Sequence, residues 1–277
     1  MKNLNELMSL SREIGIPVDR VVREEIQKLI LRYLAERRFF SGGVFQGGTA
    51  IRLFYQGARF SEDLDFVFRE KDHALFSGLS PVLRDLPGFL RKQVPFSGDV
   101  ELAKQKGSGL LVRFKLKLQV PEKGSRLVIN LEFASVPSLQ PQVLLLRVDP
   151  VDVPVAVEDE NEILADKVVA IALREFVKGR DLWDIDFLIR TRNVSLPDPN
   201  LILAKAKAYG CAPVEFLDRL GRRIPLLQEE GLAALDAEMR RFLPRQLMED
   251  LVSSFPELLA RVIGAVQSVW ARMEKAT

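Results

Sequence analysis

The chain has 277 residues, of which 47% are hydrophobic, and its formal net charge is +2. A chain of this length and composition can bury an ample core in one large domain or two modest ones, which excludes a disordered tail. With so small a net charge, any affinity for nucleic acid must come from an uneven distribution of charge.

The cysteine and histidine content restricts the possible sites. The single Cys211 cannot form an internal disulfide, and the single His73 excludes a metal site built from several histidines. No run of about 18 apolar residues occurs, and the first residues lack the apolar stretch of a signal peptide. We therefore expect a cytoplasmic protein with no membrane partner.

The first expected element is a helix over residues 19–37, where apolar residues recur every three to four positions and Asp19 is placed to cap the start. A turn at Ser41, Gly42 and Gly43 then leads into a short strand over residues 44–46. This helix is expected to pack against the sheet.

A glycine pair follows that strand directly. Gly47 and Gly48 precede Thr49, which opens a segment with the periodicity of a helix. Glycines allow the backbone close to a ligand, and a helix N-terminus attracts anions, so this order predicts a phosphate cradle. The other interpretation is a tight turn with no ligand.

Two aspartates stand one residue apart in the next expected strand, residues 63–68. Because side chains alternate along a strand, Asp63 and Asp65 lie on one side and Leu64 and Phe66 on the other. Two carboxylates that share a small space favour a cation, and oxygen ligands suit Mg²⁺. The alternative is an Asp pair that faces solvent at a strand edge.

These stretches carry a family resemblance. The run Gly-Gly-Thr-Ala-Ile-Arg at 47–52 and the run Arg-Phe-Ser-Glu-Asp-Leu-Asp-Phe at 59–66 resemble the signature of the AbiEii/AbiGii (MenA-like) nucleotidyltransferase toxins. That family belongs to the polymerase-β-like nucleotidyltransferase superfamily. Gln46 departs from the Lys of many relatives.

Three expected strands follow, over residues 100–104, 110–120 and 126–133. The middle strand places Arg113, Lys115 and Lys117 on one face. This basic face either protects a sheet edge or binds phosphates of a nucleotide or RNA. In the third strand Glu132 shares a face with Asn130, and the family resemblance implies that Glu132 is the third acidic residue of the metal site.

The second half of the chain is expected to be helical from Glu160 onward, after short strands over 143–148 and 153–157. The stretch ending at Lys167 and the run Arg-Asp-Leu-Trp-Asp at 180–184 resemble further motifs of the same family. Lys167 and Arg174 lie two helical turns apart, so we expect them to share a helix face and to reach triphosphate oxygens. Asp181 is either part of this motif or a helix N-cap paired with Arg180.

The fold expected is therefore α+β: a nucleotidyltransferase-type mixed-sheet domain, residues 1–158, and a helical domain, residues 159–277, that closes the active-site cleft. Beyond residue 200, successive amphipathic helices are expected, with breaks at the prolines 213, 225, 244 and 256.

The resemblance implies a Mg²⁺-dependent transfer of a nucleoside monophosphate from an NTP to an acceptor hydroxyl at the tRNA 3′ end, by the toxin of a toxin–antitoxin pair. Two Mg²⁺ ions would be held by Asp63, Asp65 and Glu132, which with Lys167 form the catalytic set. The residues expected to bind the nucleotide are Gly47, Gly48, Thr49, Arg59, Ser61, Lys167, Arg174 and Asp184. The alternatives are transfer to a protein hydroxyl and a nucleotide- or RNA-binding module without turnover.

Overall fold

The computed structural model describes residues 3–69, 73–105, 109–120 and 125–275. The chain forms two compact units, Met1–Glu158 and Asp159–Thr277, which are described separately below. The side chain of His73 lies outside the description.

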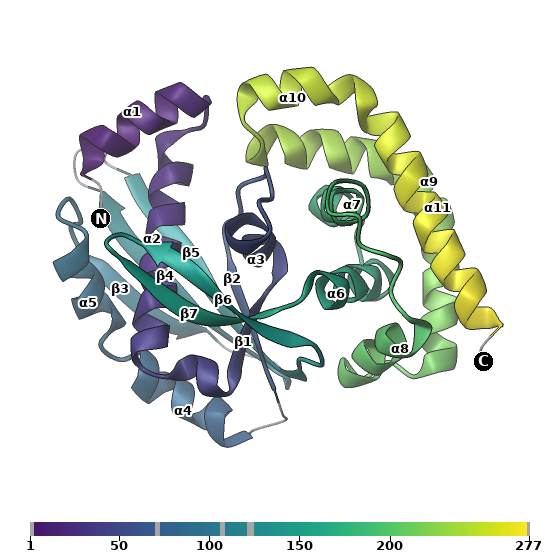
Figure 1. Ribbon diagram of the computed structural model, residues 1–277, viewed down its shortest axis with the longest axis horizontal. Helices are drawn as coiled ribbons and strands as arrows, with labels where there is room; N and C mark the ends of the chain where they lie inside the picture. The colour runs from purple at the N-terminus through teal and green to yellow at the C-terminus, as the bar shows by residue number, and fades with distance from the viewer. Residues whose placement is uncertain (1–2, 70–72, 106–108, 121–124, 276–277) are drawn as a thin grey trace. The chain divides into compact units, whose positions relative to one another are not determined.

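A seven-stranded mixed sheet forms the centre of the first unit (Figure 1). The strand order is β3-β4-β5-β2-β1-β7-β6. Strands β2 and β5 are parallel, as are β1 and β7, and the other neighbours are antiparallel. The strands are β1 Gly43–Gln46, β2 Leu64–Phe68, β3 Val100–Gln105, β4 Leu111–Val120, β5 Ser125–Pro137, β6 Pro141–Val148 and β7 Val151–Glu158. A mixed α+β fold is thereby confirmed.

Helices accompany this sheet, and the longest of them, α2, contacts β5, β6 and β7. The expected cap of α2 is wrong: Pro17 occupies the N-cap position and Asp19 lies inside the first turn. The N-cap lies two positions earlier than expected because Pro17 has a non-helical backbone with ψ 135°, and Asp19 still favours the positive helix end. The helices of this unit are α1 Leu4–Ile14, α2 Val18–Glu36, η1 Phe39–Ser41, α3 Gly47–Phe54, α4 His73–Leu83 and α5 Leu86–Gln93.

An aromatic cluster fills the core below the central strands. Phe66 on β2 stacks on Phe133 of β5 with ring centroids 4.9 Å apart, and Phe45 on β1 lies 5.3 Å from Phe66. Each of these rings is fully buried. Because successive side chains of a strand point to opposite faces, this packing fixes the side on which Asp65 and Glu132 stand.

The second unit is helical. Its elements are α6 Glu160–Leu173, α7 Gly179–Asp186, η3 Phe187–Thr191, α8 Pro199–Ala208, α9 Pro213–Phe242, α10 Arg245–Leu251, η4 Val252–Ser254 and α11 Phe255–Glu274. The expected break at Pro225 is wrong, because α9 continues through it. Pro225 is exposed, while Leu220, Leu227 and Leu235 on the same helix are buried. Their burial offsets the roughly 3 kcal/mol cost of an internal proline.

Among the helices that the structure describes, none combines the length and the apolar character needed to cross a membrane.

Candidate active site

A row of polar side chains crosses the sheet of the first unit. In the strand register, Asp65 on β2 is paired with Gln46 on β1 and with Glu132 on β5, and Glu132 is paired with Arg113 on β4. All four residues are partly exposed. Residues paired in register lie on the same face of a sheet, so Asp65 and Glu132 are neighbours opposite the aromatic core.

Asp63 lies on the same face. Strand β2 begins at Leu64, one residue later than expected, so Asp63 is the last residue of the preceding loop. Asn130 Nδ2 donates to Asp63 Oδ1 at 2.8 Å, and Asn130 stands two residues before Glu132 on β5. The structure therefore places Asp63, Asp65 and Glu132 on one face, as the alternation predicts.

Arg113 forms an ion pair with the third carboxylate. Arg113 Nη2 lies 2.6 Å from Glu132 Oε1, and the two side chains are 40% and 23% exposed. The sequence interpretation grouped Arg113 with the lysines of β4 and did not foresee this pair. Part of the charge of Glu132 is thus balanced within the sheet.

The glycine turn brings a helix N-terminus to Asp65. Gly47 has a φ of +79°, and a Cβ at this position would lie only 2.5 Å from Asp65 Oδ2. A glycine is therefore required both for its backbone conformation and for the space that the carboxylate occupies. Helix α3 starts at Gly47, and its N-cap residue Gln46 provides no side-chain cap. The two features predicted separately, the cradle and the carboxylates, lie together.

Two of the expected nucleotide ligands are buried supports of this site. Thr49 is 1% exposed and donates its hydroxyl to the Asp63 carbonyl at 2.5 Å. Arg59 is 2% exposed, donates to the Phe60 carbonyl at 3.3 Å, and its guanidinium packs where a Cβ of Gly48 would stand. Ser61 is partly exposed. Contact of these three residues with phosphate stays a prediction.

The residues present fit Mg²⁺ held by a small number of carboxylates. Among the described residues, no group of three or more Asp, Glu, His or Cys side chains converges into a complete metal-binding cluster. Mg²⁺ does not need one, because it is commonly held by one or two carboxylates together with water and substrate phosphates. Asp63 and Asp65 supply such oxygens next to the cradle, and Glu132 as a third ligand stays a prediction.

In the second unit, Lys167 is buried between two aspartates. Lys167 Nζ lies 3.0 Å from Asp181 Oδ1 and 2.8 Å from Asp184 Oδ2. Lys167, Asp181 and Asp184 are 8%, 2% and 0% exposed. Asp184 thus neutralises Lys167 within this unit, and a role of either residue in nucleotide binding stays a prediction.

Two expectations about these charged residues, one at α6 and one at α7, are wrong. Arg174 is the C-cap residue with an extended backbone, so it shares no helix face with Lys167. The two cations nevertheless share one carboxylate, because Arg174 Nη1 also pairs with Asp181. Asp181 is not an N-cap: Lys178 holds that position in α7, and the Arg180 N–H donates to Glu238 at 2.8 Å instead.

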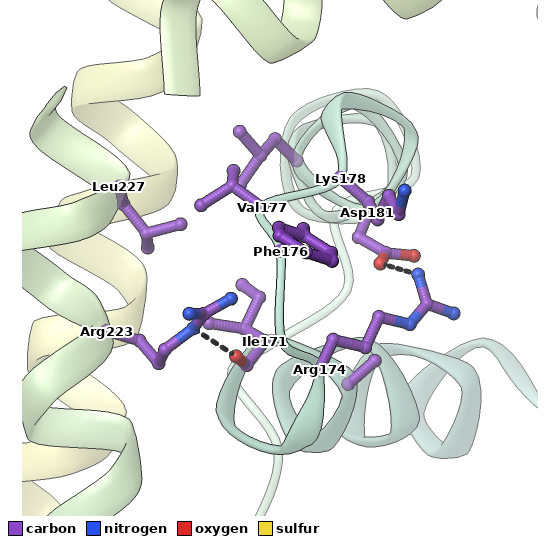
Figure 2. A pocket seen from close by; sticks show the side chains of 10 residues that line it. Ile171, Arg174, Phe176, Val177, Lys178, Asp181, Arg223 and Leu227 are labelled. Atoms are coloured by element: carbon purple, nitrogen blue, oxygen red, sulfur yellow. Dashed lines mark hydrogen bonds and ion pairs between the residues drawn. The ribbon is translucent and has the colours of Figure 1, made fainter. Parts of the chain in front are cut away.

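The surroundings of Asp181 hold it in the charged form. Burial would raise the pKa of Asp181, but the charges of Lys167 and Arg174 outweigh it, and its pKa lies below the usual value. Figure 2 shows the Arg174–Asp181 pair beside the loop that carries Phe176. Arg223 of α9 donates to the carbonyl of Ile171 in the last turn of α6 and to that of Glu175 in this loop, each at 3.0 Å.

Sequence reasoning missed the polar side chains of α2 that touch the site loop. Arg20 and Arg23 pair with Glu62, and Gln27 donates to the Ser61 carbonyl. The available signal was their spacing, because positions 20, 23 and 27 lie on one face of the helix.

The sequence over residues 29–261 matches the model of the AbiEii family, described as nucleotidyl transferase toxins of type IV toxin–antitoxin systems. The chain belongs to the AbiEii family. The resemblance drawn from the motifs is thereby confirmed, and the chain is a nucleotidyltransferase with an NTP as substrate and an antitoxin as the partner that the family implies.

Solved structures agree with the fold. The AbiEii chain is similar to MenT4, a nucleotidyltransferase toxin from Mycobacterium tuberculosis, with a TM-score of 0.56, 20% identity and 99% of each chain covered. It is also similar to an H. pylori protein described as a nucleotidyltransferase, with a TM-score of 0.55, 18% identity and coverage of 93% of this chain and 97% of that one. A comparison with curated proteins finds no match.

Proposed function

We propose that this AbiEii chain transfers a nucleoside monophosphate from an NTP to the hydroxyl at the 3′ end of tRNA, with Mg²⁺ held by Asp63, Asp65 and Glu132. One observation carries the proposal: the Asp65 carboxylate lies against Gly47, where α3 begins, and stands in register with Glu132. Metal-binding oxygens and a phosphate-binding helix end therefore belong to one site.

The cradle binds and orients the triphosphate in this proposal. The first N–H groups of α3 point out of the helix end, and the close backbone at Gly47 lets phosphate oxygens approach them. The bound orientation aligns the α-phosphorus for in-line attack by the acceptor oxygen, and pyrophosphate leaves. Ser61, two residues before Asp63, would add a hydroxyl donor.

The carboxylates supply the metal ligands. Mg²⁺, of which two ions would bind, would neutralise phosphate charge and activate the acceptor hydroxyl. The protein holds the ligands in place: Asn130 fixes Asp63 at 2.8 Å, and Arg113 fixes Glu132 at 2.6 Å.

The basic face of β4 supports tRNA as the acceptor. Lys115 and Lys117 stand on the same face as Arg113, and all three are partly exposed. Lys115 is in register with Asn130, the residue that binds Asp63. Cations that continue from the catalytic row along a strand match the repeated phosphates of a nucleic acid backbone.

An acceptor screen tests this proposal. The full chain is incubated with each labelled NTP, Mg²⁺ and either total tRNA or the protein alone. We expect one NTP to label tRNA, with loss of the label when the 3′ hydroxyl of the tRNA is oxidised beforehand. Label that appears on protein and never on tRNA would contradict the acceptor assignment.

A further inference from the structure

Three side chains of α2 hold the loop that leads into the catalytic aspartates. Arg20 Nη1 and Arg23 Nη1 both donate to Glu62 Oε1, at 3.0 and 2.9 Å. Gln27 Nε2 donates to the Ser61 carbonyl at 3.2 Å. The helix thus reaches the two residues immediately before Asp63; we call these three side chains and their two partners the α2 clamp.

The α2 clamp is shielded from water. Arg20, Arg23 and Gln27 are 9%, 8% and 1% exposed, and the Glu62 side chain is 20% exposed. Charge-assisted hydrogen bonds in such surroundings are stronger than exposed ion pairs, and removing one partner leaves a charge without compensation. The clamp is therefore a firm attachment, unlike an ordinary surface pair.

The same loop is held at its other positions from α3 and β5. Arg52 Nη1 donates to the carbonyls of Gly57 and Ala58, at 3.0 and 3.3 Å. Thr49 donates to the Asp63 carbonyl, and Asn130 holds the Asp63 side chain. The clamp adds contacts at residues 61 and 62, directly before Asp63, so α2 contributes to the position of Asp63.

We propose that Arg20, Arg23 and Gln27 are positioning residues, which hold Asp63 and Asp65 in their working geometry through Glu62 and Ser61. This inference rests on the function proposed above. All three residues precede residue 29, where the match to the family begins. Metal and phosphate chemistry requires ligands placed to within about 0.5 Å, which explains why a loop would need such an attachment.

The test compares clamp variants with a matched pair on the same helix. The clamp variants are Arg23→Gln, Glu62→Gln and their combination, and Arg23→Lys is the conservative variant. The control is Arg32→Gln, which removes the 2.7 Å pair with Glu36 on α2 away from the loop. Three quantities are measured on the full chain: kcat, KM for the NTP, and the amide hydrogen exchange of residues 61–65.

We expect each clamp variant to lower kcat at least tenfold, with KM changed less than threefold and with faster exchange at 61–65. The double variant should be no worse than Glu62→Gln alone, because that substitution already removes the ion pairs of Glu62 with both Arg20 and Arg23. Arg23→Lys should recover most of the loss, and the control should stay within twofold of the parent.

Two other outcomes separate this inference from the function. If the parent transfers nucleotide and the clamp variants match it in kcat and exchange, the clamp proposal is overturned while the function stands. If the parent transfers nothing to any acceptor, the proposed function fails; faster exchange in the variants would then still uphold the attachment of the loop, and equal exchange would overturn it.

Discussion

The position of the Asp65 carboxylate depends on a single neighbouring residue, Gly47. The positive φ of Gly47 and the space beside it are both used, the first by the turn and the second by the Asp65 carboxylate. An L side chain at position 47 would meet backbone strain and this carboxylate at once. The glycine is therefore part of the site and does more than form a turn.

Replacing Gly47 with alanine tests this dependence. We expect Gly47→Ala to cost about 1–3 kcal/mol of stability, from strain at φ +79°. Nucleotide transfer should fall at least a hundredfold, because the Cβ displaces Asp65. Thermal unfolding and initial rates measure the two effects. The control is Gly88→Ala in α5, where a Cβ meets open space, and this variant should keep both its stability and its transfer rate. A Gly47→Ala enzyme that transfers nucleotide at the parent's rate would contradict the geometry described.

Local alternation was enough to predict which acids share a face. Asp63, Asp65 and Glu132 were predicted to face away from the core because period-two patterning is a property of each strand alone. The partners of these acids could not be predicted in the same way. Arg113 meets Glu132, and Asn130 meets Asp63, only through strand register and pairing between distant segments.

At the scale of elements, strand β4 presents its lysines beside the polar row. Arg113 is engaged with Glu132, so Lys115 and Lys117 are the better candidates for binding the acceptor. The strand and its two faces were predicted from strict alternation. That Arg113 pairs with Glu132 while the lysines do not take part in this pair is visible only from the pairing of β4 with β5.

Neutralising these lysines should therefore weaken acceptor binding alone. We expect Lys115→Gln with Lys117→Gln to reduce the slope of log affinity against log salt for tRNA by about one for each phosphate that is no longer bound, up to about two. NTP binding should stay unchanged. Lys92→Gln with Lys275→Gln is the control for net charge. A salt slope equal to that of the parent would favour the other interpretation, in which these lysines only protect a sheet edge.

Helices α6 and α7 are joined by buried charges. The sequence indicated Lys167 in one motif and Asp181 and Asp184 in another, both through the family resemblance. The arrangement of these charges was not predictable: Arg174 is the C-cap residue of α6, and Lys167 pairs with Oδ1 of Asp181 while Arg174 pairs with Oδ2. Burial of this set makes the join between the two helices dependent on ionisation.

Acidic pH should weaken the ion pairs of Asp181 that link α6 and α7. The pKa of Asp181 is lowered by Lys167 and Arg174 against the effect of burial. Its contribution to stability is complete above the unfolded pKa of about 3.9 and is lost as the pH falls through the lower folded pKa. We expect urea unfolding of Asp181→Asn to depend less steeply on pH below about 4, by up to about 1.4 kcal/mol per pH unit. Equal slopes for variant and parent would contradict the assignment.

For the whole molecule, the site depends on contacts between segments far apart in sequence. Strand β2 lies beside β5, more than sixty residues away, and α2 reaches the loop before β2 from some forty residues upstream. Periodicity predicted the elements and the two-part division of the chain. It could not predict the strand order, and at α9 tertiary packing overrode the proline that marked an expected break.

In the proposed function, Asp65 and the polar side chains in register with it form the catalytic centre of an AbiEii nucleotidyltransferase that acts on tRNA. The direct measurement is the rate at which Asp65→Asn adds labelled nucleotide to the tRNA 3′ end, compared with the parent and with Asp152→Asn on the exposed part of β7. We predict a loss of a thousandfold or more, about 4 kcal/mol in the barrier, with thermal unfolding unchanged and the control fully active. An Asp65→Asn enzyme that labels tRNA at the parent's rate would contradict the account.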